Sequence, residues 1–115
     1  MSQATEAFVQ RLVIANPELQ PLLDEHLEDN FGELLPHLWT SDLARHVVAR
    51  YQSDGSDAVA PLLEQLDEAA GHDPEVDEVL GVSFVELLPN PGEPGAEVTD
   101  LLGPRLKAML HEQRS

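Results

Sequence analysis

The chain has 115 residues, of which 22 are acidic and six are basic, so its formal charge is −16 with neutral histidines. Hydrophobic residues make up 42% of it, enough for a core, which argues against wholesale disorder. The absence of cysteine excludes a disulfide framework, a thiolate zinc site and a cysteine nucleophile. The few Lys and Arg residues argue against nucleic-acid binding, because contacts to phosphates need those side chains.

Pro and Gly divide the first third of the chain into segments with helical spacing. A helix is predicted over residues 5–15, and Asn16 followed by Pro17 has the pattern of an N-cap and first helical position for the next helix. Pro21 should delay the regular helix by a turn, and Gly32 should end it. The apolar face of this second helix is predicted to contain Leu19, Leu22, Leu23, Leu27 and Phe31.

The next segment is predicted to contain a short turn and a longer helix. Pro36 should limit residues 33–39 to one helical turn. Thr40 or Ser41 should then cap a helix that runs to a turn at residues 53–56.

Two further helices are predicted in the second half of the chain. Ser56 should cap the first of them, and Gly71 should end it in the left-handed conformation. Asp73 and Pro74 repeat the cap-then-proline pattern and should start the second. Residues 82–85 (Val-Ser-Phe-Val) are β-prone and could form a strand, but helical periodicity continues up to them and favours a helix.

The C-terminal part is predicted to contain a loop and a broken helix. Three prolines and two glycines within residues 89–95 predict an exposed loop. The last helix should begin near Ala96 or Glu97, and Gly103-Pro104 should kink it or split it in two.

These elements predict an all-α fold, because no segment shows sustained strand alternation. We expect a single domain over residues 1–115, with five or six short helices packed as antiparallel hairpins, possible hairpins being 41–70 and 73–110. Stacked hairpins of this kind would resemble a short helical-repeat layer, although the sequence has no clean internal repeat. No apolar run approaches the roughly 18 residues that would span a bilayer, and the N-terminal sequence lacks the features of a secretory signal. We therefore expect no membrane association and a cytoplasmic location.

The acidic residues are not evenly mixed with basic ones. The 54 residues between Arg50 and Arg105 contain 13 acids and no Lys or Arg, so ion pairs within the chain can neutralise only part of the charge. A solvated surface, an adaptation to high salt and an electrostatic surface for a partner each explain this distribution, and they are not exclusive.

Two groups of carboxylates are the candidates for binding a basic protein partner. The 24–29 carboxylates, on the polar side of the second predicted helix, are Asp24, Glu25, Glu28 and Asp29. The 64–78 carboxylates, which bracket the connection at 71–73, are Glu64, Asp67, Glu68, Asp73, Glu75, Asp77 and Glu78. Trp39 is expected in the core, whereas an exposed Trp39 would be a natural interface anchor.

Three of the five histidines lie close together in the sequence and suggest an alternative, a metal site. Asp42 and His46 share a helix face, and His26 and His37 could join them if the segments fold back on one another. The spacing matches no standard zinc signature. The simpler interpretation is that these histidines are partly exposed or form hydrogen bonds to carboxylates.

No pattern supports catalysis. Ser83 lies in Gly-Val-Ser-Phe-Val, which lacks the second glycine of a nucleophile elbow, and no Gly-rich phosphate loop is present. We therefore expect no catalytic residue, no cofactor and a non-enzymatic role.

Several motifs together resemble a known family. They are Glu-His-Leu at 25–27, Gly-Glu-Leu-Leu-Pro-His-Leu at 32–38, Ser-Phe-Val-Glu at 83–86, Pro-Gly-Glu-Pro-Gly at 91–95 and Leu-Leu-Gly-Pro at 101–104. They resemble a family of small acidic bacterial proteins known only as a domain of unknown function, over roughly residues 16–110. The resemblance implies a bacterial cytoplasmic protein and transfers no activity.

The leading hypothesis is therefore a non-enzymatic binding protein, of immunity-protein or antitoxin type, that occludes a basic protein through clustered carboxylates. The alternatives are a metal-binding helical protein and a helical scaffold module whose acidity serves solubility only.

Overall fold

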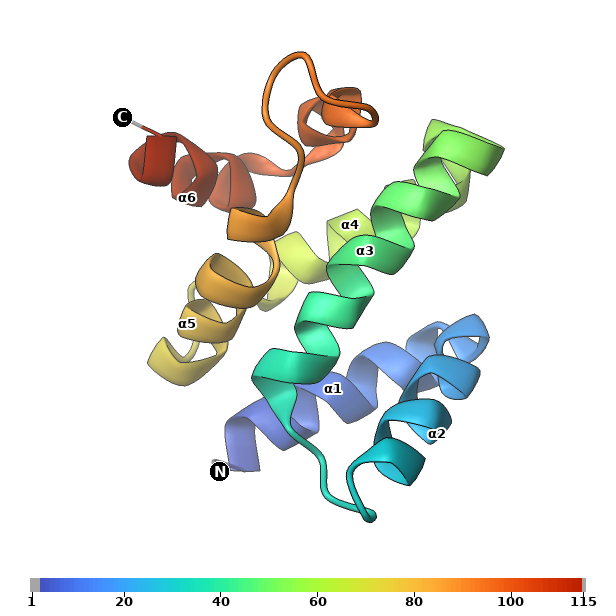
Figure 1. Cartoon of the computed structure of the whole chain (residues 1–115). Helices are drawn as coiled ribbons and strands as arrows, with labels where there is room; N and C mark the ends of the chain where they lie inside the picture. The colour runs from blue at the N-terminus through green and yellow to red at the C-terminus, as the bar shows by residue number, and fades with distance from the viewer. Residues whose placement is uncertain (1–2, 115) are drawn as a thin grey trace.

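The computed structural model describes residues 3–114, which contain α-helices and short 3-10 turns and no strand (Figure 1). This confirms the predicted all-α fold. The α-helices are α1 (Gln3–Ala15), α2 (Gln20–Asp29), α3 (Pro36–Asp54), α4 (Ser56–Ala69), α5 (Pro74–Ser83) and α6 (Pro104–Arg114). The 3-10 turns are η1 (Pro17–Leu19), η2 (Val85–Leu87) and η3 (Ala96–Leu101). No helix among residues 3–114 is both long enough and apolar enough to cross a membrane.

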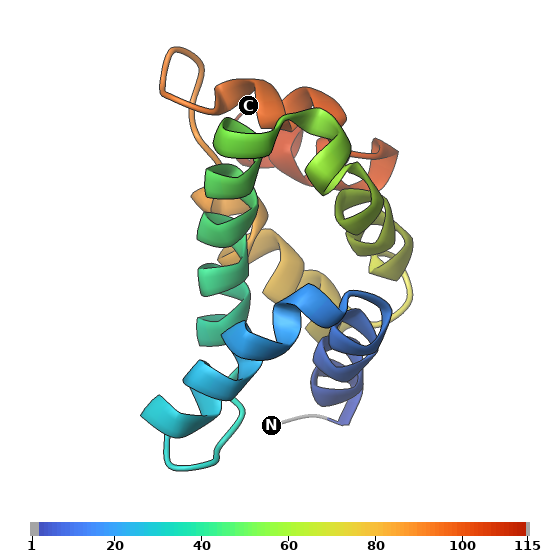
Figure 2. The ribbon, with the colours of Figure 1, turned by 90° about the vertical axis from the view of Figure 1, so that its right-hand side faces the viewer.

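Helix α3 is the axis of the molecule. The two views show α1 and α2 at one end of α3, and η3 and α6 at the other (Figures 1 and 2). Trp39, Leu43 and Val47 of α3 are fully buried, and they belong to one core with apolar residues of α1, α4, α5 and α6. Trp39 is therefore a core residue, as expected, and is not available as an interface anchor.

The start of α3 differs from the prediction. Pro36 does not limit a short turn but opens the longest described helix, 19 residues long, so that Thr40 and Ser41 lie inside the helix and cap nothing. Proline fits the first helical turn because its missing N–H has no intrahelical partner there. Thr40 is buried, and Ser41 Oγ donates a hydrogen bond to the carbonyl oxygen of His37, one turn back.

The two cap-then-proline motifs behave differently. Asp73 caps α5 as predicted, because its carboxylate accepts hydrogen bonds from the N–H groups of Glu75 (2.8 Å) and Val76 (3.3 Å). Asn16 makes no side-chain cap. Its amide instead donates to the carbonyl oxygen of Leu12 (2.9 Å) and to Gln65 Oε1 (2.6 Å), which ties the end of α1 to α4. A long-range partner has replaced the expected local one.

The connections confirm most of the predicted breaks. Regular helix α2 begins only after η1, as Pro21 predicted, and Gly71 adopts a left-handed φ of +88° after α4. Ser56 forms no side-chain cap, since Gly55 is the residue that precedes α4. Residues 82–85 continue α5 and enter η2 instead of forming a strand, and the last predicted helix is split into η3 and α6.

The loop at residues 89–95 is exposed from Asn90 to Pro94, but its last residue is buried. Gly95 has a φ of +83°, and a Cβ atom there would lie 2.9 Å from Cγ1 of Val48 on α3. This close approach requires glycine and holds the end of the loop against α3.

Candidate functional site

The 24–29 carboxylates lie on α2, beside a groove between α2 and the first half of α3. The groove has a volume of about 600 Å³. Helix α2 contributes Leu22, Glu25, His26 and Asp29 to its lining. Helix α3 contributes Leu38, Asp42, Arg45 and His46. We call this concavity the α2–α3 groove.

The 24–29 carboxylates have no basic partner within residues 3–114. All four side chains belong to exposed residues, and the ion pairs of this part of the chain are Asp42–Arg45 (2.7 Å) and Arg50–Asp54 (3.5 Å), both within α3. Asp24 accepts a hydrogen bond from Gln20 Nε2 (2.8 Å), which leaves its charge uncompensated. The α2 side of the groove is therefore negatively charged.

Phe31 follows Asn30, the last residue of this segment that lines the groove, and it has an unusual conformation. It was predicted on the apolar face of α2, but α2 ends at Asp29, and the side chain of Phe31 is fully exposed at a relative accessibility of 101%. The helix ends through a hydrogen bond from the N–H of Gly32 to the carbonyl oxygen of Leu27 (2.7 Å), with Phe31 in the left-handed region at φ +57°. This chain reversal turns Phe31 away from the core that the helical spacing implied.

His46, on the α3 side of the groove, is shifted toward its neutral form. Partial burial, together with the charge of Arg50, lowers the pKa of His46 below the ordinary value of 6.5, and Glu18 opposes this shift. A neutral imidazole adds no positive charge to the groove, so the carboxylates keep their effect on a basic ligand.

Three of the four residues of the metal alternative, His26, Asp42 and His46, line the α2–α3 groove, but they are not arranged to hold a metal ion. His26 is 4% exposed, and its Nε2 accepts a hydrogen bond from the N–H of Leu35 (3.0 Å), which occupies the lone pair a metal would need. His37 is hydrogen-bonded through Nδ1 to Ser83 Oγ on α5 (2.6 Å) and does not line the groove. Within residues 3–114, no group of three or more His, Asp or Glu side chains is arranged to hold a metal ion.

The 64–78 carboxylates divide into structural and free members. The structural members are three half-buried aspartates, each bonded to backbone N–H groups. Asp67 accepts from Arg105 (2.9 Å) and Leu106 (3.0 Å) at the start of α6, and Asp77 accepts from Gly71 (2.8 Å). Asp73 caps α5, as described above. The free members are exposed glutamates, namely Glu64, Glu68, Glu75 and Glu78.

The sequence model of a family described as a domain of unknown function, DUF7674, matches residues 9–115. The chain belongs to this family. The match confirms the resemblance drawn from the motifs. No curated protein and no solved structure shows significant similarity to the chain.

Sequence reasoning did not find two features of this DUF7674 domain. The exposure of Phe31 depends on where α2 ends, and Gly32 gave a partial signal because a glycine after a helix favours the reversal found here. The capping of α6 by Asp67 joins residues 38 positions apart, and no local pattern carries that information.

Proposed function

We propose that this DUF7674 domain is a non-enzymatic binding protein of the bacterial cytoplasm, of immunity-protein or antitoxin type, that occludes a basic protein partner. Its binding face consists of the 24–29 carboxylates, the α2–α3 groove and Phe31. The observation that carries the proposal is Phe31, an aromatic side chain that is fully exposed on a left-handed backbone, two residues after the unpaired Asp29.

Phe31 has a costly conformation without a compensating contact in the fold. A left-handed backbone costs an L-residue about 1–2 kcal/mol, and glycine or asparagine is the usual choice at such a helix end. Its ring is also fully exposed, so burial in the core does not offset that cost. Strained backbone positions cluster at functional sites, and large aromatic side chains are frequent anchors of interfaces.

The charges beside Phe31 suit a basic partner. The 24–29 carboxylates make no ion pair within residues 3–114, so lysines and arginines of a partner can approach them without displacing an internal base. Leu38, which is 46% exposed, offers apolar surface in the same groove. Carboxylates that surround an apolar contact steer a basic protein and then hold it, and the association is fast and sensitive to salt.

The test is affinity capture from a lysate of the source organism at low salt, with stepwise elution by NaCl and identification of the eluted proteins. Wild-type bait should retain one basic protein, released at a few hundred millimolar NaCl as the Debye length falls below about 10 Å. Bait with Phe31→Ala should lose most of that protein while keeping the wild-type melting temperature, because the exposed ring makes no contribution to the core.

A Leu87→Ala bait is the matched control, since Leu87 is another exposed large apolar residue, 44% accessible, in η2 on α5's C-terminal side. The control should capture as much as the wild type. Equal capture by the wild-type and Phe31→Ala baits contradicts the proposed face, and the absence of any salt-eluted basic protein contradicts the proposed function.

A further inference from the structure

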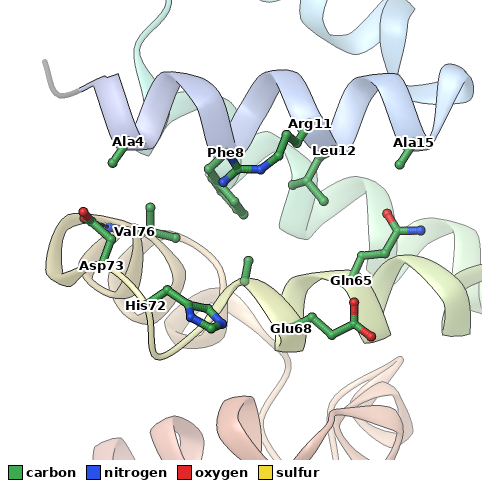
Figure 3. Close-up of a pocket in the computed structure, with 11 residues that line it drawn as sticks. Ala4, Phe8, Arg11, Leu12, Ala15, Gln65, Glu68, His72, Asp73 and Val76 are labelled. Atoms are coloured by element: carbon green, nitrogen blue, oxygen red, sulfur yellow. Dashed lines mark hydrogen bonds between the residues drawn. The ribbon is translucent and has the colours of Figure 1, made fainter.

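A second concavity lies between α1, the end of α4 and the start of α5 (Figure 3). Its volume is about 450 Å³, and none of the residues that line it also lines the α2–α3 groove. Phe8 of α1 lies toward Val76 at the start of α5, and Leu12 lies farther along α1, toward the end of α4 (Figure 3). All three side chains are at most 4% exposed, so they form the bottom of the cleft. We call it the α1–α4–α5 cleft.

Arg11 is the charged residue that distinguishes this cleft. In residues 3–114, the other arginines are engaged: Arg45 and Arg50 pair with carboxylates, and Arg105 and Arg114 donate to backbone carbonyl oxygens. Arg11 has no carboxylate within ion-pair distance and donates no hydrogen bond in this part of the chain, although the chain contains 22 acids. Its guanidinium lies over the cleft beside Phe8 (Figure 3).

The acids that line the cleft do not neutralise Arg11. The carboxylate of Asp73 accepts two backbone N–H groups at the start of α5, as described above. The carboxylate of Glu68 lies toward Gln65, at the other end of the cleft from the guanidinium of Arg11 (Figure 3). His72 lies on the wall opposite α1. The Arg11 end of the cleft thus has an unpaired cation beside apolar side chains.

We infer that the α1–α4–α5 cleft binds a small amphiphile with an apolar body and a carboxylate head. The apolar body packs on the partly exposed Ala4 and Ala69 and on the small accessible parts of Phe8, Leu12 and Val76, and the carboxylate pairs with Arg11. A cleft of this volume is in the range of small-molecule sites, which combine an apolar lining with a few polar groups. The planar guanidinium matches a carboxylate with two parallel hydrogen bonds.

The net charge of the protein selects a monoanion and gives the binding an unusual salt dependence. A charge of −16 repels an anion at long range, and the repulsion grows with the charge of the ligand, which disfavours dianions such as phosphate esters. Salt screens this long-range repulsion more than the direct contact with Arg11. Affinity therefore rises from low to moderate salt, opposite to the behaviour of the basic partner proposed for the α2–α3 groove.

The experiment is an NMR titration of the full chain with octanoate, followed through backbone amide shifts at 20 and 150 mM NaCl. Octan-1-ol and octylammonium serve as uncharged and cationic probes of the same length. Octanoate should give saturable shifts at Phe8, Leu12 and Val76, and its affinity should be higher at 150 mM NaCl. At 150 mM NaCl, where the long-range effect of the net charge is screened, octan-1-ol and octylammonium should bind more weakly than octanoate.

Two charge-matched variants locate the head group. Arg11→Gln should weaken octanoate binding about tenfold or more, since it removes the charged group that donates hydrogen bonds to the carboxylate. Lys107→Gln removes the same charge from an exposed site on α6 and should leave affinity within twofold of wild type. Absence of saturable shifts, equal binding of octanoate and octan-1-ol, or equal loss in both variants overturns the inference. None of these results bears on capture of a basic protein by the α2–α3 groove.

Discussion

The acidic residues of α2 and those around the connection between α4 and α5 look alike in composition but differ in what they do. In α2, the exposed carboxylates accept no hydrogen bond from the backbone N–H groups of residues 3–114. Around the α4–α5 connection, Asp67, Asp73 and Asp77 each accept backbone N–H groups. Local acidity therefore does not distinguish carboxylates that stabilise the fold from those available to a partner. Hydrogen bonds from backbone N–H groups do distinguish them.

The largest expected effect comes from Asp67, which joins α4 to the start of α6. Asp67→Ala removes the acceptor of two N–H groups at that start and should lower the free energy of unfolding by about 1–2 kcal/mol. Urea denaturation measures the change. Glu64→Ala, an exposed position on the same helix, is the control and should change stability by no more than about 0.5 kcal/mol. Equal losses in both variants would remove the distinction between structural and free carboxylates.

Replacing Phe31 with glycine should change the free energy of unfolding in the opposite direction. Phe31→Gly exchanges left-handed strain for greater freedom of the unfolded chain, and the balance should raise the free energy of unfolding by about 0.5 kcal/mol. Phe31→Ala keeps the strained backbone and should have wild-type stability. Urea denaturation of both variants tests this, and a loss above about 1 kcal/mol in Phe31→Ala would show that the ring packs against the fold.

Neutralising α2 should stabilise the protein slightly. The variant with Asp24→Asn, Glu25→Gln, Glu28→Gln and Asp29→Asn removes two like-charge pairs at i,i+4 spacing, 24 with 28 and 25 with 29. Such pairs each destabilise a helix by about 0.2–0.5 kcal/mol, so the melting temperature should rise at low salt and the gain should shrink as salt is added. A marked loss of stability would mean that these carboxylates have a structural role.

The smallest expected effect is the pH dependence due to His46. Because the folded-state pKa of His46 lies below 6.5, the unfolded chain takes up its proton first as the pH falls. The free energy of unfolding of the wild type should therefore fall relative to that of His46→Gln as the pH is lowered from 7.5 to 5. Above pH 7.5 the difference between the two free energies should be constant. A difference in melting temperature between the two proteins that does not change from pH 7.5 to 5 would contradict the lowered pKa.

The sequence predicted the fold class and most helix boundaries because those depend on local signals. Gly71 and the Asp73-Pro74 pair act through their own backbone geometry and their neighbours, so the local sequence was enough to predict their roles. Pro36 was misassigned because the same residue can break a helix or open one, and the difference lies in the preceding Leu35, which is extended.

The candidate site was less predictable, because it depends on which charges remain unpaired after folding. The 24–29 carboxylates were named from the sequence, but their difference from the 64–78 carboxylates came only from contacts between distant segments. The sequence gives no sign that Arg11 is unpaired, since an arginine among many acids is expected to find a carboxylate, and its lack of one is a property of the folded chain.

The most direct test of the central claim, that α2 carries the binding face, compares two charge-matched baits in the affinity capture. One is the neutralised α2 variant, and the other has Glu64→Gln, Glu68→Gln, Glu75→Gln and Glu78→Gln, so each loses four of the 16 net negative charges. We predict that the α2 variant loses the basic partner and that the glutamate variant retains it. Equal loss in both would show that net charge alone drives capture, and loss only in the glutamate variant would place the binding face at the α4–α5 connection.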